Sequence, residues 1–179
     1  MKRGLFILAA FLMVVASLQA QKGKISVGGG LAYGTEIKKM GINLRGYYGI
    51  TDKIDAAPSF TYFFPDKEEY FGGETKWNVW EFNLDGHYKF VESDQYNVYG
   101  IAGLNFTGTH WSSNYEFENP ITGQTEKYDD SDSDLNIGLN IGAGGQYNFN
   151  EKLGAFTELK YVISNYDQLV ITFGIIYGL

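Results

Sequence analysis

The chain has 179 residues, enough for one domain with a sizeable core, and it contains no cysteine, which excludes disulfide bonds and thiolate metal sites. Its formal net charge is −7, and it becomes −9 without the first 20 residues, which carry two cations and no anion. An acidic chain of this kind is a poor candidate for nucleic-acid binding, while 17% aromatic residues favour β-strands.

The first 20 residues predict a cleavable secretory signal peptide. Lys2 and Arg3 precede an apolar run over residues 5–15, and Ala20 offers a small residue for cleavage before Gln21. The run is shorter than the roughly 20 residues of a membrane-spanning helix, which argues against an anchor. We therefore expect a signal peptide over residues 1–20 and one β-barrel domain over residues 21–179.

After Gln21, apolar and polar side chains alternate with a period of two, which is the pattern of half-buried strands. In the segment 79–90, for example, Trp80, Phe82 and Leu84 alternate with Glu81, Asn83 and Asp85. In the segment 96–108, Tyr99 and Ile101 depart from this rule because they share the parity of polar residues. The expected strands cover residues 25–33, 40–50, 54–64, 79–90, 96–108, 135–149, 153–163 and 168–179.

The connections alternate in length along the chain. Short turns are expected at residues 51–53, 91–95 and 150–152, and more variable loops at 34–39, 65–78, 109–134 and 164–167. The longest of these loops, 109–134, has room for extra hairpin strands. Segments of about ten residues with short turns at one end and longer loops at the other predict an eight-stranded antiparallel up-and-down transmembrane β-barrel, an all-β fold.

The composition of the two faces indicates which solvent meets the apolar side chains. A soluble barrel, the alternative, would expose charged residues on its polar face, but here that face is mostly Gly, Asn, Ser, Thr and Gln. Aromatic residues of outward parity fall near strand ends, as in the interfacial girdles of membrane barrels. They are Tyr33, Tyr48, Tyr88, Phe90, Tyr147, Phe149 and Tyr161.

The C-terminus alternates to its last residue, with Ile171, Phe173, Ile175, Tyr177 and Leu179 on one face. In this and over the whole mature chain, the sequence resembles the small outer-membrane β-barrel family of Gram-negative bacteria, the OmpA/OmpX-type barrels. The usual terminal residue there is Phe, where this chain has Leu179. The resemblance implies residence in the cell outer membrane, contact with its lipid and lipopolysaccharide, and assembly by the barrel-assembly machinery through the C-terminal strand. It implies no single activity.

Charged residues of inward parity form a candidate lumenal cluster. An unpaired charge in a packed lumen is expensive, so we expect Arg45 to lie within salt-bridge reach of Asp85 or Glu158. Such a cluster could gate a narrow pore or fill a rigid polar core, and we favour the core because eight strands leave an interior that side chains just fill. Its members are Arg45, Glu81, Asp85, His87, Lys89, Glu158 and Lys160.

Two further motifs contain residue types that could carry chemistry. The segment YDDSDSD, residues 128–134, places Asp130, Asp132 and Asp134 at alternate positions, but it lacks the glycine and terminal glutamate of a calcium loop, so we interpret it as a solvated loop. His110 and Ser112 faintly resemble the His-x-Ser element of the lipid A deacylases, with Glu116 or Glu118 as the candidate third group. We predict no catalytic, metal or cofactor site.

The leading functional hypothesis is a non-enzymatic outer-membrane barrel with a structural or surface-recognition role. Recognition of an extracellular partner would use the loops 65–78 and 109–134, because loops on a rigid scaffold commonly carry binding. Two alternatives stay open: a narrow conduit for small solutes, and a lipid A-modifying enzyme that uses His110 and Ser112.

Overall fold

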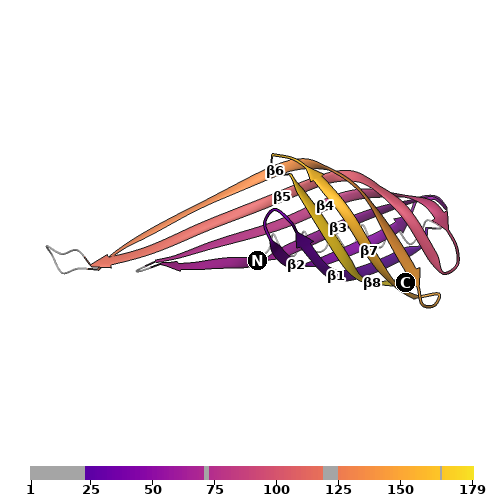
Figure 1. Cartoon of the computed structure of the whole chain (residues 1–179), viewed down its shortest axis with the longest axis horizontal. Helices are drawn as coiled ribbons and strands as arrows, with labels where there is room; N and C mark the ends of the chain where they lie inside the picture. Colours follow the sequence, from indigo (N-terminus) through magenta and orange to yellow (C-terminus); the bar gives the residue numbers. More distant parts are fainter. Residues whose placement is uncertain (1–22, 71–72, 119–124, 166) are drawn as a thin grey trace, which may run out of the picture.

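The structure, a computed structural model, describes residues 23–179 except 71–72, 119–124 and 166. Eight consecutive antiparallel strands close into a barrel because β1 pairs with both β2 and β8 (Figure 1). The predicted signal peptide, residues 1–20, lies outside the described residues. The strands are β1 (Ile25–Gly34), β2 (Lys39–Gly49), β3 (Ile54–Tyr70), β4 (Gly73–Glu92), β5 (Tyr96–Glu118), β6 (Thr125–Asn148), β7 (Leu153–Ile163) and β8 (Gln168–Gly178).

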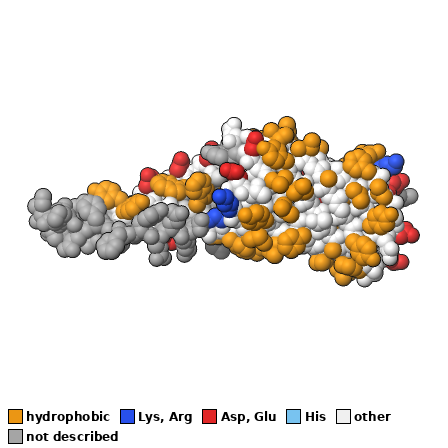
Figure 2. Space-filling view, in the orientation of Figure 1, with side chains coloured by type: hydrophobic (Ala, Val, Ile, Leu, Met, Phe, Trp, Pro, Cys, Tyr) orange, Lys and Arg blue, Asp and Glu red, His pale blue; other side chains and the backbone are white. Residues whose placement is uncertain are grey.

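The apolar side chains of the alternating pattern point out of the barrel. Leu139 is 56% exposed and Ile175 is 48% exposed, whereas Asn140 is only 3% exposed. Hydrophobic side chains accordingly spread over the outer surface of the barrel in Figure 2. Tyr99 and Ile101, which depart from the alternation, are both buried on the inner side. The predicted eight-stranded antiparallel barrel with an outward apolar face is therefore confirmed.

The shorter strands have the length that a membrane barrel requires. β1, β2, β7 and β8 contain 10 or 11 residues each, which at about 3.3 Å per residue and a tilt near 45° cover the apolar band of roughly 25 Å. Within the described residues, no helix has the length and hydropathy that a bilayer span demands.

The strands β3 to β6 are much longer than the sequence pattern predicts. They contain 17, 20, 23 and 24 residues, so most of the expected loops 65–78 and 109–134 is strand. Figure 1 shows the β3–β4 and β5–β6 hairpins extending far beyond one end of the barrel. We call the strand residues of these hairpins within 65–78 and 109–134 the projecting sheet. In the described part of the structure, β6 pairs with β7 only from Leu139 onward, and β3 pairs with β2 only up to Phe63. The two outer margins of the projecting sheet therefore have no neighbouring strand of the barrel among the described residues.

Candidate functional site

An ion pair between β2 and β7 lies in the middle of the lumen. Arg45 Nη1 is 2.5 Å from Glu158 Oε1, and both side chains are almost fully buried. Arg45 Nε also donates to Asn43 Oδ1 at 2.8 Å, and Nη1 donates to the Tyr47 hydroxyl at 3.1 Å. Its guanidinium carbon lies 4.1 Å from the centre of the Phe156 ring. The predicted contact of Arg45 with Glu158 is therefore present, and the guanidinium is held on several sides.

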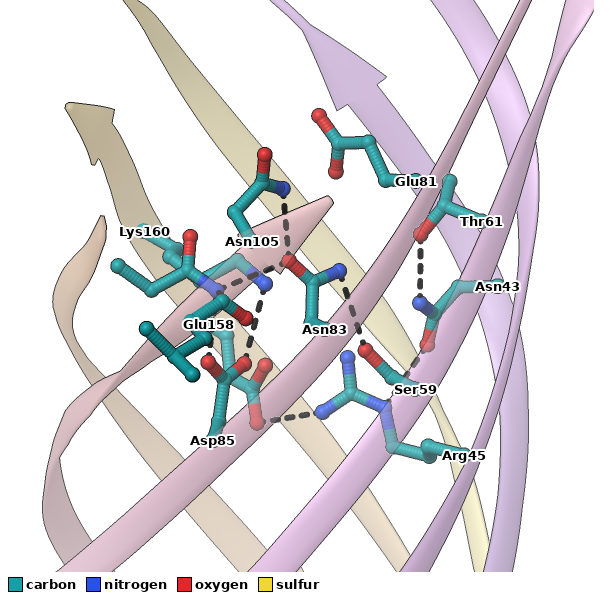
Figure 3. A network of polar contacts seen from close by, with 12 residues as sticks. Asn43, Arg45, Ser59, Thr61, Glu81, Asn83, Asp85, Asn105, Glu158 and Lys160 are labelled. Atoms are coloured by element: carbon teal, nitrogen blue, oxygen red, sulfur yellow. Dashed lines mark hydrogen bonds and ion pairs between the residues drawn. The ribbon is translucent and has the colours of Figure 1, made fainter. Parts of the chain in front are cut away.

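A second ion pair crosses the lumen between β7 and β4. Lys160 Nζ donates to Asp85 Oδ2 at 3.1 Å. The other oxygen of this carboxylate accepts a hydrogen bond from Asn140 Nδ2 at 2.7 Å. The same amide donates to Asn83 Oδ1 at 2.8 Å, which also accepts from Asn105. Figure 3 shows this network of side chains linking several strands across the interior.

His87 lies beside the first ion pair and is enclosed by two tyrosines. Its Nε2 is 3.8 Å from Glu158 Oε1. Its ring stacks on Tyr99 with centroids 4.5 Å apart, and Tyr47 meets it edge-on at 5.7 Å. Tyr99 donates its hydroxyl hydrogen to Glu158 at 2.9 Å. His87 therefore packs into the network around Glu158, as a structural residue would.

The two remaining members of the predicted cluster have their own hydrogen-bond or salt-bridge partners. Glu81 is fully buried and accepts a hydrogen bond from Gln168 Nε2 at 2.5 Å. Lys89 pairs with Asp55 at 3.1 Å and also donates to the backbone oxygen of Asp52, in the turn after β2. The structure therefore groups Arg45, Asp85, His87, Glu158 and Lys160 around the two ion pairs. Glu81 interacts with Lys160 and Asn83 at the edge of this group, and Lys89 lies nearer the short turns.

Two small apolar layers lie above and below the polar network. The layer toward the projecting sheet consists of Ala32, Phe63, Val79, Val162 and Val170. The layer toward the short turns consists of Tyr47, Ala57, Phe156 and Ile176. The described interior is thus apolar, polar and apolar along the barrel axis, which fits an eight-stranded barrel filled by its own side chains.

An open polar cavity lies at the short-turn end of the barrel. Its volume is ≈ 800 Å³, and its lining includes Tyr47 and Ile176 of the apolar layer toward the short turns. Lys24, Asp55 and Lys89 line its wall together with several amide side chains. This cavity is the mouth of the barrel, and it extends inward as far as the apolar layer toward the short turns.

His110 does not bond to the serine that the sequence motif proposes. Its Nδ1 lies 2.8 Å from the Ser133 hydroxyl on the neighbouring strand, which is directly opposite it in the ladder. The backbone N–H of Ser133 donates to Asp132 Oδ1 at 2.8 Å. The side chains of Glu116 and Glu118, the proposed third group, lie outside the described part of the structure. Only the pairing of β5 with β6 reveals the contact of His110 with Ser133.

Asp130, Asp132 and Asp134 lie on one face of β6, as their alternation predicts. In the ladder they stand opposite Ser113, Trp111 and Thr109 of β5. Among the described residues, no group of three or more His, Cys, Asp or Glu side chains is arranged to hold a metal ion.

The sequence interpretation missed the neutral members of the lumenal network. Asn43, Asn83, Asn105 and Asn140 are each at most 3% exposed, and they connect the two ion pairs to neighbouring strands. Tyr99 departs from the strand alternation, yet its hydroxyl bonds to Glu158. Their position in the strand alternation could have identified them, because every one of these residues lies on the same inward face as the predicted charges.

Comparisons with known proteins agree with this geometry. The chain is similar to the N-terminal β-barrel domain of Pseudomonas aeruginosa OprF, with 17% identity, a TM-score of 0.54, and coverage of 88% of this chain and 100% of that one. It is similar to the attachment invasion locus protein Ail of Yersinia pestis, solved in complex with the heparin analogue sucrose octasulfate, with 17% identity, a TM-score of 0.56, and coverage of 89% and 100%.

A major outer membrane protein from Thermus thermophilus superposes with a TM-score of 0.65 at 12% identity, covering 89% of this chain and all of that one. At such identities these likenesses show the fold alone. No curated protein matches the sequence. The model of the outer membrane protein beta-barrel domain matches residues 5–177, almost the whole chain. The chain therefore belongs to the outer membrane protein beta-barrel family and resides in the outer membrane.

Proposed function

We propose that this protein is a non-enzymatic barrel whose projecting sheet makes contacts at the cell surface. The observation that carries the proposal is the length of the strands. β6 has 24 residues where β7 has 11, and the excess of about 13 residues corresponds to about 43 Å of strand. An element of that length is not needed to cross the membrane, so we infer that it serves recognition outside it.

The lumen supports a structural role for the barrel itself. The side chains of the two ion pairs bond to one another, and the two apolar layers pack on either side of them, so together they occupy the interior of the barrel. A conduit would need these contacts to open, and each buried charge would then lose its partner. We therefore rank the narrow conduit below surface recognition.

The partners of the barrel wall follow from its outward face. We propose contact with outer-membrane lipid and lipopolysaccharide along the exposed apolar side chains, including Phe173 and Ile175. We also propose that the barrel-assembly machinery reads the C-terminal strand β8, whose outward alternation continues to Leu179 just after the strand. This strand closes the barrel against β1, so it must be available before closure.

A variant without the projecting sheet tests the proposal. Asn-Gly turns would join Phe64 to Asn78 and His110 to Ser133, because these pairs lie near or in register at the base of the hairpins. Cells with equal surface levels of full and trimmed chain would be compared for autoaggregation and for attachment to heparin-coated and albumin-coated glass. We expect autoaggregation, or attachment to at least one of the coated surfaces, to decrease in cells that carry the trimmed chain. Equal behaviour of the two chains on every surface would overturn the proposal.

A further inference from the structure

One face of the projecting sheet continues the inner face of the barrel. Residues that pair directly across a ladder point to the same side of a sheet. Trp77 of β4 stands opposite Trp111 of β5, which stands opposite Asp132 of β6. Asp134 accepts a hydrogen bond from the lumenal residue Asn136 at 2.8 Å. We call this surface the inner projecting face, made of Thr75, Trp77, Trp111, Ser113, Tyr115, Tyr128, Asp130, Asp132 and Asp134.

Aromatic side chains on this face are exposed. Trp77 is 53% exposed, and further out Tyr115 and Tyr128, which pair with one another across the ladder, are 47% and 57% exposed. These residues have inward parity, but they lie beyond the barrel, where the described part of the chain supplies no opposite wall. Ser113 on the same face is buried and Trp111 is half-buried, so the exposed part consists of the other aromatic residues and the aspartates. An exposed sheet face with large aromatic residues is typical of an interaction surface.

The charge of the projecting sheet defines the partner. Residues 65–78 and 109–134 contain 11 Asp and Glu but only 3 Lys, a balance of −8, while the whole chain carries −7. Asp130, Asp132 and Asp134 are exposed, and among the described residues no cation lies within salt-bridge distance of them. Lys76 has the opposite parity from Trp77, so it belongs to the other face, where it pairs with Glu74 at 3.1 Å.

We propose that the inner projecting face docks an extended cationic peptide segment of a partner protein. Alternate residues of a strand are about 6.6 Å apart, so the three aspartates match Lys or Arg at alternate positions of an extended chain. The indole faces of Trp77 and Trp111 would receive the cations or their methylene stems. A polyanion such as the heparin analogue bound by Ail would be repelled here. This inference rests on the proposed recognition role of the projecting sheet.

Peptide binding to the full mature chain in nanodiscs of zwitterionic lipid tests the proposal. The probe is a fluorescein-labelled (Lys-Ser)5 peptide, with (Glu-Ser)5 and protein-free nanodiscs as blanks. Asp132→Asn should weaken binding about two- to fivefold, as loss of one exposed charge pair does. Asp129→Asn removes the same charge from the opposite face of the same strand and should leave affinity unchanged. Trp77→Ala should weaken binding about two- to fivefold by removing an aromatic contact.

The outcomes separate this inference from the proposed function. Equal weakening by Asp129→Asn and Asp132→Asn would show attraction by overall charge, and it would overturn a defined docking face. Binding of (Glu-Ser)5 or heparin in place of (Lys-Ser)5 would also overturn it. If surface contacts require the projecting sheet but are insensitive to Asp132→Asn and Trp77→Ala, recognition stands and the cationic partner is wrong. Unchanged circular dichroism and thermal unfolding would show that each variant is folded.

Discussion

Arg45 and Glu158 form a buried ion pair that joins β2 to β7, strands that are not neighbours in the barrel wall. The pair therefore connects two parts of the wall through the lumen, where the backbone ladder cannot. Arg45→Met would leave the Glu158 carboxylate buried without its cation, which costs about 3–5 kcal/mol. Urea unfolding of the chain refolded into lipid bilayers would measure this loss.

The double variant Arg45→Met with Glu158→Gln is the matched control. It removes both charges, and replacing a buried pair with neutral residues is often close to neutral in stability. We expect the double variant to recover much of the loss of the single one. Equal unfolding free energies for the two variants would show that the carboxylate is not stranded by loss of Arg45.

Gly103 lies where a side chain of β4 closely approaches β5. A Cβ at this position would overlap Asp85 Oδ1 and the backbone oxygen of Leu84. Gly103→Ala should therefore displace Asp85 from Lys160 and destabilise the barrel by about 1–3 kcal/mol. Gly86→Ala is the control, because the atom nearest to its added Cβ is Ala102 O at 3.6 Å. The same unfolding measurement should show little change for it.

The depth of the lipid-facing residues predicts a graded response to charge. Phe173 lies in the middle of β8, and Phe149 lies in the short turn after β6; both are at least half exposed to the surroundings of the barrel. Phe173→Arg should destabilise the protein by about 2–4 kcal/mol and Phe149→Arg by about 0–1 kcal/mol. Similar losses for both, measured in bilayers, would contradict our placement of the membrane.

The filled lumen predicts no steady ion current. The apolar layers and the ion pairs would have to separate before ions could pass. Recordings from planar bilayers with the purified chain should therefore show a closed baseline, and liposome swelling with small sugars should match protein-free liposomes. A stable open channel that the charge variant Arg45→Met alters would favour the conduit instead.

The enzyme alternative predicts a change in lipid composition. His110 bonds to Ser133, so both His110→Ala and Ser133→Ala would disable any serine chemistry at this place. We expect the mass spectrum of lipid A to be the same in cells that carry the original chain, either variant, or none. Loss of one acyl chain only in cells with the original protein would establish the enzyme.

The sequence predicts the faces of the strands much better than the contacts across the lumen. Parity alone places Arg45, Asp85 and Glu158 inside, since side chains alternate with period two. The choice of Glu158 for Arg45, and of Lys160 for Asp85, depends on which residues stand at the same height. Height is set by strand tilt and by the stagger of all eight strands, which a single segment does not encode.

The projecting sheet escapes the sequence pattern for a different physical reason. Inside the membrane, one face of each strand must be apolar, so alternation marks the strand. Outside it, both faces meet water, and polar residues such as Asp129 and Asp130 can be adjacent while the backbone ladder continues. The alternation therefore ends at the membrane surface, although the strands do not.

The margin of β6 before Leu139, which the described ladder does not pair with β7, has a consequence for self-association. Its open N–H and C=O groups could hydrogen-bond with the same margin of another copy, which is how exposed strands nucleate fibrils. In an antiparallel pairing of two such margins, Asp129, Asp130, Asp132 and Asp134 of one copy would meet those of the other. Their mutual repulsion would disfavour this edge-to-edge pairing, as charged residues do on the outermost strands of soluble sheets.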